Sequence, residues 1–166
     1  MATTAKSALS TGPRIRQAGD SDVEALTRLI NAAFVVERVV FDSDRVDTLG
    51  VRAYMQKGTF LVAEDARSLV GCVYLELRSD RSNLGLLSVD PPLQGLGLGR
   101  LLVEAAEDFA RKTGARMMDL RVISARAELL PFYRRAGYQE TGTAPFAPDL
   151  TAKVPSHYIL MSKLLS

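Results

Sequence analysis

Residues 94–100 of this 166-residue chain read Gln94-Gly95-Leu96-Gly97-Leu98-Gly99-Arg100, and this glycine-rich turn decides how the rest of the sequence is interpreted. It lies between a predicted strand, Asn83 to Val89, and the clearest predicted helix, Gly99 to Lys112. Because glycines carry no side chains, successive backbone N–H groups can converge on one anion, and the helix that starts there adds the positive end of its dipole. Arg100 can place a full charge beside those amides. The turn therefore predicts a site for phosphate or pyrophosphate.

Two familiar glycine-rich motifs fit this turn poorly. A P-loop requires Gly-Lys-Ser/Thr at the start of the helix, whereas Gly99 is followed by Arg100 and Leu101. A dinucleotide-binding fingerprint requires its third glycine three positions after the second, and Arg100 occupies that position after Gly97. A tight strand-to-helix turn without a ligand is the remaining alternative, but such a turn rarely needs glycines at alternate positions followed by an arginine. The pattern favours an anion site.

Around this turn, strands and helices follow one another in an order typical of a mixed α+β fold. Two early strands, Phe60 to Ala63 and Leu69 to Leu77, are separated by a short charged turn, which predicts a hairpin. Later strands alternate with helices, so we expect a mixed sheet flanked by helices. The other expected elements are a strand at 14–18, a helix that begins at the capping box Ser21-Asp22-Val23-Glu24, a helix at 45–56, a strand at 117–123, a helix at 128–136, and strands at 138–143 and 157–164.

Length and composition predict one globular domain. The chain is 47% hydrophobic and 24% charged, which is enough apolar sequence for a core, and chains usually split into domains only beyond about 250 residues. We expect the domain to cover residues 14–166. Residues 1–13 are rich in Ser, Thr and Ala and lack the apolar segment of a secretory signal, so they are predicted to form a disordered tail.

Charge and cysteine content exclude several classes of protein. A net charge of +2, from 21 basic and 19 acidic residues, is too small to imply the dense basic face of a nucleic-acid binder. No apolar stretch reaches the roughly 20 residues that span a bilayer, so no membrane partner is expected. The single cysteine, Cys72, excludes an internal disulfide and a cysteine-rich zinc site, and no metal is expected. These features predict a cytoplasmic protein in which Cys72 is a buried apolar residue.

Two motifs, in this order and at this spacing, resemble the GNAT N-acetyltransferases. The turn at 94–100, after a strand that ends Leu87-Ser88-Val89, is similar to the acetyl-CoA-binding motif of that family, Gln/Arg-x-x-Gly-x-Gly/Ala. The stretch from Phe132 and Tyr133 to Gly137-Tyr138 is similar to the family's late-helix motif, Phe-Tyr-x-x-x-Gly-Tyr/Phe. The resemblance extends from about Arg14 to the C-terminus. It implies a central, mostly antiparallel sheet that is splayed, and an acetyl-CoA-dependent N-acetyltransferase activity.

The resemblance also implies where acetyl-CoA binds. In this family the strand before the turn splays from its neighbour, and the pantetheine arm lies in the gap like an added strand. The backbone of Leu87, Ser88 and Val89 would then pair with the arm and receive the thioester. The residues whose backbone amides would hold the pyrophosphate are Gln94, Gly95, Leu96, Gly97, Leu98, Gly99 and Arg100.

Tyr133 matches the family's tyrosine that protonates the leaving thiolate. A positioned phenol can donate this proton, and such transfer is typically worth about 10²–10⁴ in rate. The alternative is that Tyr133 only packs beside Phe132. Because neighbouring helix positions differ by about 100°, the two rings point to different sides, and one of them can leave the core. We favour the catalytic role.

The general base is where the sequence departs from the family pattern. Many members carry a glutamate on the central strand, but no acidic residue lies between Asn83 and Val89. Glu76, on the preceding strand, is the nearest replacement, with a solvated carboxylate or a water chain as the alternatives. The family's frequent Asn, seven residues before the tyrosine, is replaced by Arg126, which puts one side-chain contact to CoA in doubt.

The acceptor is expected to be a primary amine on a small molecule or a peptide terminus, but no stretch of the sequence identifies it. Acidic residues gather in the early helical region that usually walls the acceptor pocket. Because Arg38 and Arg45 interleave with them, we interpret the region as a solvated surface of mixed charge rather than a cation site. The acidic residues are Glu37, Asp42, Asp44 and Asp47. Members of the family often dimerise, so the resemblance allows for a homodimer.

Two other functions compete with the enzyme. A non-catalytic module that binds acyl-CoA would keep the glycine-rich turn and lose the catalytic groups, and the missing strand glutamate favours it mildly. The presence of Tyr133 favours the enzyme. A plain nucleotide-binding protein is disfavoured by the absent P-loop lysine.

Overall fold

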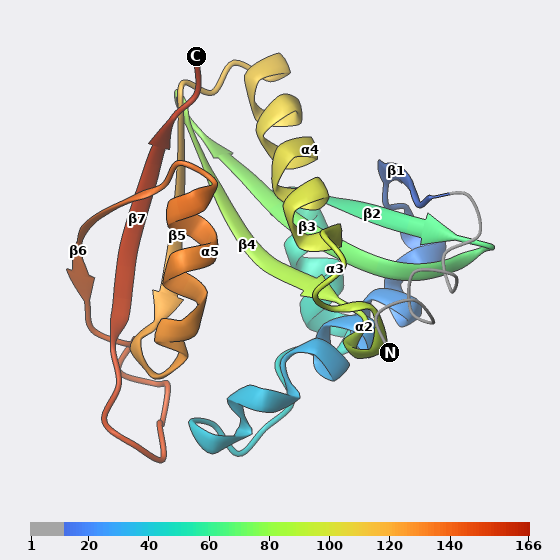
Figure 1. The fold of residues 1–166 in the computed structure, drawn as a ribbon. Helices are drawn as coiled ribbons and strands as arrows, with labels where there is room; N and C mark the ends of the chain where they lie inside the picture. Colours follow the sequence, from blue (N-terminus) through green and yellow to red (C-terminus); the bar gives the residue numbers. More distant parts are fainter. Residues whose placement is uncertain (1–11) are drawn as a thin grey trace.

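The computed structural model describes residues 12–166, which form a seven-stranded sheet with the order β1-β2-β3-β4-β5-β7-β6. All neighbouring strands are antiparallel except β4 and β5, which run parallel (Figure 1). The expected mixed, mostly antiparallel sheet is thus confirmed. The predicted tail at 1–13 lies almost wholly outside the described residues.

The strands agree closely with those expected from the sequence. The hairpin of β2 and β3 turns through Ala66 and Arg67, both with positive φ. The strand bounds are β1 Arg14–Gln17, β2 Thr59–Asp65, β3 Ser68–Arg78, β4 Arg81–Val89, β5 Met117–Ile123, β6 Gln139–Ala144 and β7 Tyr158–Leu164.

The helices are shorter and more interrupted than expected in two places. The first helix ends at Ala33 and continues as a 3-10 segment, and the late helix loses its first residues to another 3-10 segment, η4. The bounds are η1 Asp20–Asp22, α2 Val23–Ala33, η2 Val35–Val39, α3 Thr48–Lys57, η3 Pro91–Leu93, α4 Leu98–Lys112, η4 Ser124–Leu129 and α5 Leu130–Arg135.

The capping box expected at Ser21-Asp22-Val23-Glu24 is wrong. The chain enters η1 from the extended Gly19, and Asp22 makes the capping contact: its carboxylate accepts a hydrogen bond from the Gly19 backbone N–H at 2.8 Å. The Arg16 guanidinium donates to both oxygens of Asp22 at 2.8 and 2.9 Å. These hydrogen bonds lower the pKa of Asp22. The capping residue, Asp22, is thus held in place by Arg16 on β1, and the spacing of residues around the helix start does not reveal this contact.

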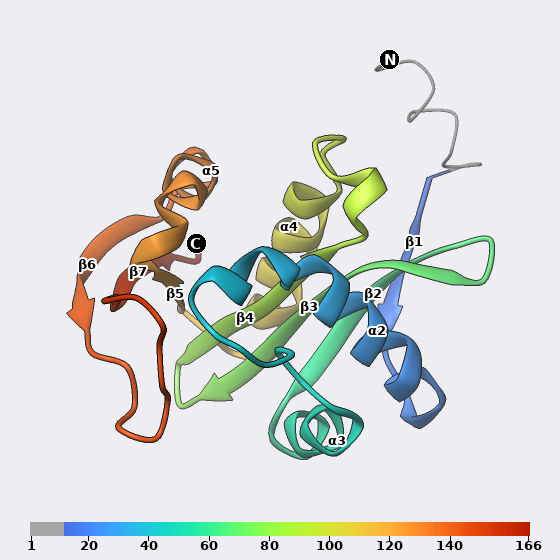
Figure 2. The same cartoon turned by 90° about the horizontal axis from the view of Figure 1, so that it is seen from below.

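Helices cover both faces of the sheet (Figures 1 and 2). On one face α2 and α3 bury a cluster with Phe60, Cys72 and Tyr74, and Cys72 is fully buried, as predicted. On the other face α4 and α5 bury the larger cluster, which includes Tyr133 and Tyr138. Burial without an ionised partner raises the pKa of the Cys72 thiol to about 12, so it remains protonated and behaves as a small apolar residue. Among the described residues, no helix is both long enough and apolar enough to cross a bilayer.

Candidate active site

The parallel strands β4 and β5 pair over only a short stretch. The paired residues are Arg81 with Met117, Ser82 with Met118 and Asn83 with Asp119, and no pair follows in the described part of the chain. Figure 1 shows the two strands converging at this end and diverging toward the end where β4 enters the glycine-rich turn. The edge of β4 that would face β5, from Leu84 to Val89, is therefore open to another strand-like partner. The splay that the resemblance implied is present.

A β-bulge in β4 bends the strand at this opening. The register with β3 shifts between Cys72 paired with Ser88 and Tyr74 paired with Gly85, and Leu86 within the bulge has φ of 51°. The bulge carbonyl, Leu86 O, accepts hydrogen bonds from the buried Ser88 Oγ at 2.9 Å and from Cys72 Sγ at 3.7 Å. Bulges bend a strand and re-aim its groups. Sequence reasoning missed this feature, although an isolated glycine inside a strand, here Gly85, is a known signal for it.

The glycine-rich turn presents a row of backbone N–H groups at the end of the open strand. Gly95 and Gly97 adopt φ of 81° and 89°, a conformation that L-residues rarely adopt, and a Cβ at either position would meet nothing within 4 Å. Leu101 N–H is the first in α4 to reach a carbonyl of the turn, that of Gly97, at 3.1 Å. The first N–H groups of a helix have no intrahelical acceptor, so those of Leu98, Gly99 and Arg100 are available. These free N–H groups suit the anion site that the sequence predicts, and the site itself stays a prediction.

The side chains of the turn have separate roles. Gln94 Nε2 donates to Val89 O at 3.1 Å, which fastens the turn to the end of β4. A Cβ at Gly99 would lie 3.6 Å from Cζ of Phe132, an ordinary van der Waals distance, so α4 packs against α5 here without requiring a glycine. Arg100 is exposed and pairs with Glu104 one helical turn later, at 3.1 Å. Its charge is therefore paired with a carboxylate of the same helix, and its expected role beside the amides of the turn stays a prediction.

Tyr133 lies in the larger core with 7% of its surface exposed. Its ring packs edge-on against Phe132, at 5.0 Å between centroids, and against Tyr138, at 5.9 Å. Burial raises its pKa to about 12, and the positive charge of Arg126 acts in the opposite direction. The expectation that one ring of the pair leaves the core is wrong, because Tyr133 is buried and the half-buried Phe132 packs against the same cluster. Tyr133 is thus a rigidly held phenol that keeps its proton well above neutral pH.

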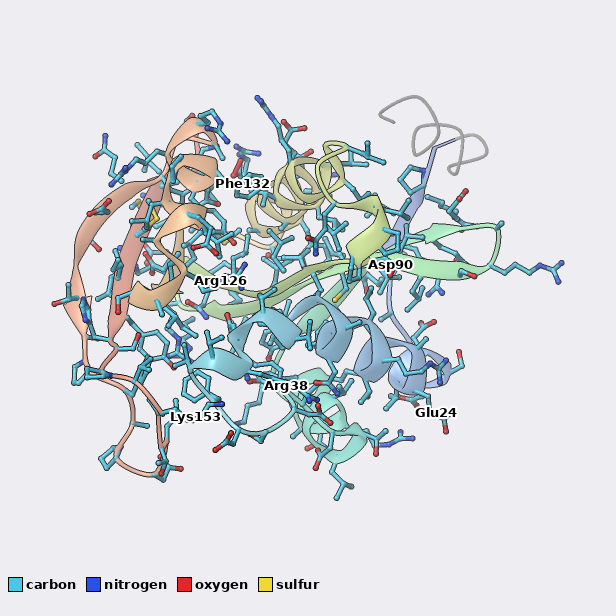
Figure 3. The ribbon with its side chains drawn as sticks, turned by 60° about the horizontal axis from the view of Figure 1, so that its bottom comes forward. Glu24, Arg38, Asp90, Arg126, Phe132 and Lys153 are labelled. Atoms are coloured by element: carbon cyan, nitrogen blue, oxygen red, sulfur yellow. The ribbon has the colours of Figure 1, made fainter. Side chains whose placement is uncertain are left out.

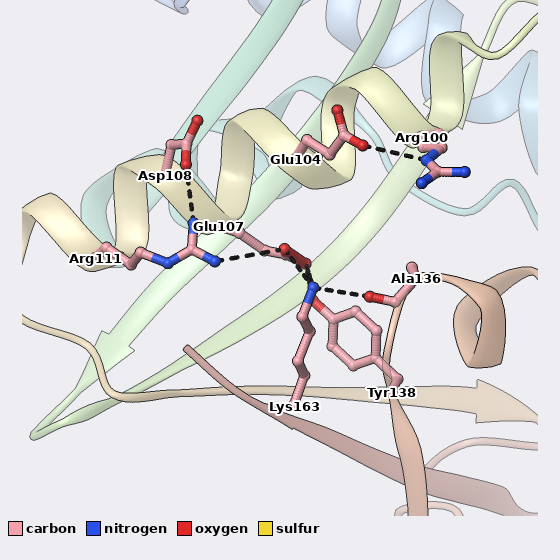
Figure 4. Close-up of polar contacts among 8 residues, drawn as sticks. All are labelled: Arg100, Glu104, Glu107, Asp108, Arg111, Ala136, Tyr138 and Lys163. Carbon is pink, nitrogen blue, oxygen red and sulfur yellow. Dashed lines mark hydrogen bonds and ion pairs between the residues drawn. The ribbon is translucent and has the colours of Figure 1, made fainter. Parts of the chain in front are cut away.

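A buried polar cluster locks α5 against α4 (Figure 4). Glu107, only 4% exposed, accepts hydrogen bonds from Lys163 Nζ at 2.7 Å and from Tyr138 Oη at 3.1 Å. Lys163 also donates to Ala136 O at 2.8 Å, at the end of α5. The Tyr138 N–H donates to Tyr133 O at 3.0 Å. The cluster therefore fixes the turn after α5 and, through it, the position of Tyr133.

Glu76, the expected base, is already engaged on both oxygens. Its Oε2 accepts from Tyr74 Oη at 3.1 Å, and its Oε1 accepts from the Arg78 guanidinium at 2.9 and 3.1 Å. Opposite Asn83 in the β3–β4 register, it lies where β4 and β5 are still paired rather than where they diverge. Nothing in these contacts tests its role, which stays a prediction.

On the other side of the opening, η2 approaches η4, and the interpretation of this region as solvated is wrong for Glu37. Glu37 is only 6% exposed, and its Oε1 lies 3.3 Å from Nη1 of Arg126. Figure 3 shows Arg126 between the η2 segment, marked by Arg38, and α5, marked by Phe132. The exposed pair of Arg38 and Asp44 does fit the solvated interpretation. Sequence reasoning missed the contact because it joins residues 89 positions apart.

Aromatic residues from three segments meet beside this contact. Phe41, which follows η2, lies 5.5 Å from Phe146 in the β6–β7 connection, and Phe146 lies 4.7 Å from Tyr158 at the start of β7, measured between ring centroids. The connection is fastened to η2 by a hydrogen bond from Lys153 N–H to Val40 O at 2.7 Å. All three rings are half-buried. We call this set of three the aromatic wall, and the Arg121 guanidinium lies over its Tyr158 ring at 4.3 Å.

Two surface hollows lie away from the opening. One, of about 430 Å³, lies beside the start of α3 and is lined by Asp44, Asp47 and Tyr54 among others. The other, of about 200 Å³, lies between Lys57 and Phe109. Neither includes residues of the glycine-rich turn, so the candidate site is the strand opening and not a closed cavity.

Comparison with known proteins agrees with this geometry. Residues 27–154 match the family model described as an acetyltransferase (GNAT) domain. The mycothiol acetyltransferase of Propionibacterium freudenreichii subsp. shermanii is 29% identical over 157 residues, covering 90% of this chain and 50% of that protein. The chain spans about half the length of the curated relatives it matches.

Solved structures share the fold. The structure of yncA from Salmonella typhimurium with its cofactor acetyl-CoA superposes with a TM-score of 0.76 at 23% identity, covering 94% of this chain and 95% of that one. The ribosomal-protein-S18-alanine N-acetyltransferase from Escherichia coli gives a TM-score of 0.73 at 18% identity, covering 93% and 94%.

Proposed function

The chain belongs to the GNAT acetyltransferase family, and from that premise we propose that the protein transfers the acetyl group of acetyl-CoA to a primary amine. The observation that carries this proposal is the open edge of β4, which leads directly into the free N–H groups at the start of α4. An extended amide-containing chain that ends in a pyrophosphate matches both parts at once. Acetyl-CoA, the co-substrate of a GNAT domain, has this chemistry.

The residues of the opening offer the groups that acetyl-CoA would need. The backbone of Leu87, Ser88 and Val89 offers strand-type hydrogen bonds to the pantetheine arm, and the bulge at Leu86 sets the angle at which they are offered. The Gln94 N–H already donates to Pro91 O at 3.3 Å, so the amides from Gly95 to Arg100 are the ones that would hold the pyrophosphate, in the open space beside Gly95 and Gly97. Bound here, acetyl-CoA supplies an activated acyl group, and the chain supplies its orientation.

Tyr133 is proposed as the general acid for the departing thiolate in a direct transfer. Its packing against Phe132 and Tyr138 fixes the ring, and its pKa of about 12 keeps the phenol protonated at every pH at which the protein is expected to act. The phenol makes no hydrogen bond to another residue within residues 12–166, so its proton is not committed to a protein acceptor there. Glu76 and a water chain remain the bases that the family resemblance suggests.

The acceptor is proposed to be a small-molecule amine or a peptide terminus. The mycothiol acetyltransferase is named for a small molecule, and the Escherichia coli enzyme for the alanine of a ribosomal protein. In either case the acceptor would present an amine to the thioester, and we place this encounter between η2 and η4. A homodimer and a cytoplasmic location stay predictions from the sequence.

An assay of thiol release tests the proposal. The protein is incubated with acetyl-CoA and a thiol reagent, with and without amines that include 2-phenylethylamine, spermidine and an alanine-initiated peptide. Thiol release that depends on an amine supports the enzyme. Tight binding of acetyl-CoA with no release for any amine would instead support the non-catalytic acyl-CoA-binding module.

A further inference from the structure

Glu37 is a buried carboxylate with one oxygen that has no partner. Its Oε1 contacts Arg126 at a long 3.3 Å, whereas its Oε2 is buried and has no hydrogen-bond partner among the described residues. Leaving a buried charged oxygen unpaired costs more than an ordinary lost hydrogen bond, so such atoms are rare in folded proteins. An unpartnered oxygen on a residue that is 6% exposed is therefore evidence for a missing donor.

The position of Glu37 suggests what this donor is. Arg126 belongs to η4, which leads directly into the helix that carries Tyr133, and its charge acts on the Tyr133 phenol as well as on Glu37. The same guanidinium therefore acts electrostatically on both Glu37 and Tyr133. A group that reaches Glu37 Oε2 must be a hydrogen-bond donor, and a carboxylate favours a cationic one.

The surroundings also indicate the body of the ligand. The Phe41 N–H donates to Glu37 O at 2.9 Å, so the backbone holds these two residues close together at the end of η2. Phe41 belongs to the aromatic wall with Phe146 and Tyr158. A carboxylate beside half-buried rings suits an ammonium group carried on an apolar, aromatic body.

We propose that Glu37 binds the ammonium group of an aromatic or similarly apolar primary amine and removes its proton before transfer. This inference rests on the proposed acetyl transfer, because it names the acceptor class and the base for that reaction. It differs from the expectation for Glu76, whose two oxygens already accept hydrogen bonds from Tyr74 and Arg78.

The protons and electrons of the proposed acetyl transfer balance with the groups that are present. The ammonium group gives one proton to Glu37 Oε2, and the freed lone pair on nitrogen attacks the thioester carbon, forming the C–N bond. The C–S bond then breaks, and its electron pair leaves on sulfur, which takes the proton of Tyr133. The excess proton on nitrogen passes to the Tyr133 oxygen, and Glu37 releases its proton to solvent. The sum is ammonium plus thioester giving amide, thiol and one proton.

Burial suits Glu37 to this role. It raises the pKa of the carboxyl above the ordinary value, while Arg126 and Arg45 act to lower it and Glu128 acts to raise it. At the end of η2, Asp42 pairs with Lys153 at 2.9 Å, and Arg38 pairs with Asp44. A base works best when its pKa approaches the working pH, so a raised value makes Glu37 a better proton acceptor than an exposed glutamate.

The competing explanation is that Glu37 only braces Arg126. Glu128 offers a matched comparison, since it contacts the same guanidinium at 2.6 Å but has a side chain that is 62% exposed. If bracing were the function, Glu37→Gln and Glu128→Gln would have similar consequences. If Glu37 receives the amine, only Glu37→Gln should change how amines bind and react.

The first experiment measures binding by calorimetry in the presence of CoA, with 2-phenylethylamine and its neutral counterpart 2-phenylethanol as probes. We expect the wild type and Glu128→Gln to bind the amine at least about tenfold more tightly than the alcohol, and Glu37→Gln to lose this preference, since a charge-assisted contact is worth about 1.5–3 kcal/mol. Affinity for CoA itself should be the same in all three proteins. A wild type that does not prefer the amine would overturn the proposal, whether or not the protein transfers acetyl groups.

The second experiment follows acetyl transfer to 2-phenylethylamine as a function of pH. Glu37→Gln should lower kcat/KM at neutral pH by about 10²-fold or more, and the deficit should shrink as pH approaches the pKa of the amine, which then needs no base. A deficit that is equal at every pH, or shared by Glu128→Gln, would assign Glu37 to bracing. A deficit in kcat/KM that shrinks with rising pH in Glu76→Gln, but not in Glu37→Gln, would assign the role of base to Glu76. Amine preference without any transfer would leave Glu37 as the amine ligand and refute the proposed enzyme.

Discussion

The two sides of the strand opening differ in composition, since backbone groups form one side and side chains form the other. The side proposed to bind the co-substrate consists of backbone: the open edge of β4 and the N–H groups of the turn from Gly95 to Arg100. The side proposed to bind the acceptor consists of side chains from distant segments, above all Glu37, Arg126 and the aromatic wall. A backbone site leaves a local signature, because only glycine permits its geometry, whereas a side-chain site leaves none until the chain has folded. The division also separates what must be constant for one co-substrate from what can vary with the acceptor.

The largest expected effect lies where the two sides meet, at Tyr133. Tyr133→Phe keeps the ring packing and removes the proton, so turnover should fall by about 10²-fold or more while acetyl-CoA affinity barely changes. Steady-state kinetics at saturating amine, together with calorimetry, checks both numbers. Because the pKa of Tyr133 is about 12, wild-type activity should rise as the amine deprotonates and fall only in strong alkali. Unchanged turnover in the variant, with chemistry shown to be limiting, would return Tyr133 to a packing role.

The backbone side can be broken at Gly97. Gly97→Val places a branched side chain into the space proposed for the pyrophosphate, so affinity for acetyl-CoA should drop by at least about tenfold. Gly114→Val is the matched control, because Gly114 has φ of 98°, open space around it and a position at the far end of α4. Both variants should lose about 1–2 kcal/mol of stability from the positive φ. Equal CoA affinity in the two variants would place the site elsewhere.

The bulge offers a milder change on the same side. Ser88→Ala removes the 2.9 Å hydrogen bond to Leu86 O, which should cost about 1 kcal/mol of stability and raise KM for acetyl-CoA several-fold. Ser82, buried on the paired part of β4, provides the control: Ser82→Ala should leave this KM unchanged. Denaturant unfolding and initial rates measure the two quantities. The same rise in KM in both variants would separate the bulge from co-substrate binding.

The smallest effect concerns the stability of the acceptor side. Burial raises the pKa of Glu37, so the folded state favours its neutral form, and this contribution to stability is lost as pH rises through the raised pKa. Glu37→Gln lacks this loss, so its Tm relative to wild type should be higher at pH 8 than at pH 4. The change should be about 2–4 °C or less, which corresponds to 1 kcal/mol in a domain of this size. A Tm difference that moves the other way would show that the charged form of Glu37 stabilises the fold.

Sequence reasoning succeeded where signals were local. The strand and helix around the turn, the β2–β3 hairpin and a mixed sheet flanked by helices followed from periodicity and turn residues within a few positions. The mostly antiparallel, splayed arrangement of the sheet came from the family resemblance. The turn at Gly95 and Gly97 could be recognised because few residue types other than glycine adopt the positive φ found there.

It failed where a partner far along the chain decided the outcome. The cap of α2 depends on Arg16 in β1, and the burial of Glu37 depends on Arg126 in η4. Arg126 was noticed only as a departure from a family pattern, and its neighbour across the opening could not be identified from spacing. The aromatic wall likewise joins Phe41, Phe146 and Tyr158, which no short-range pattern connects.

The most direct test of the central claim is the exchange of individual backbone amide hydrogens, measured by NMR with and without acetyl-CoA. If the co-substrate lies along the open edge of β4 and its pyrophosphate at the start of α4, binding should slow exchange by at least about tenfold at amides within 87–89 and 95–100, beyond the general stabilisation of the fold. Amides of β6 at the far edge of the sheet should change only by that general amount. Protection confined to other segments, with none in the turn, would contradict the account.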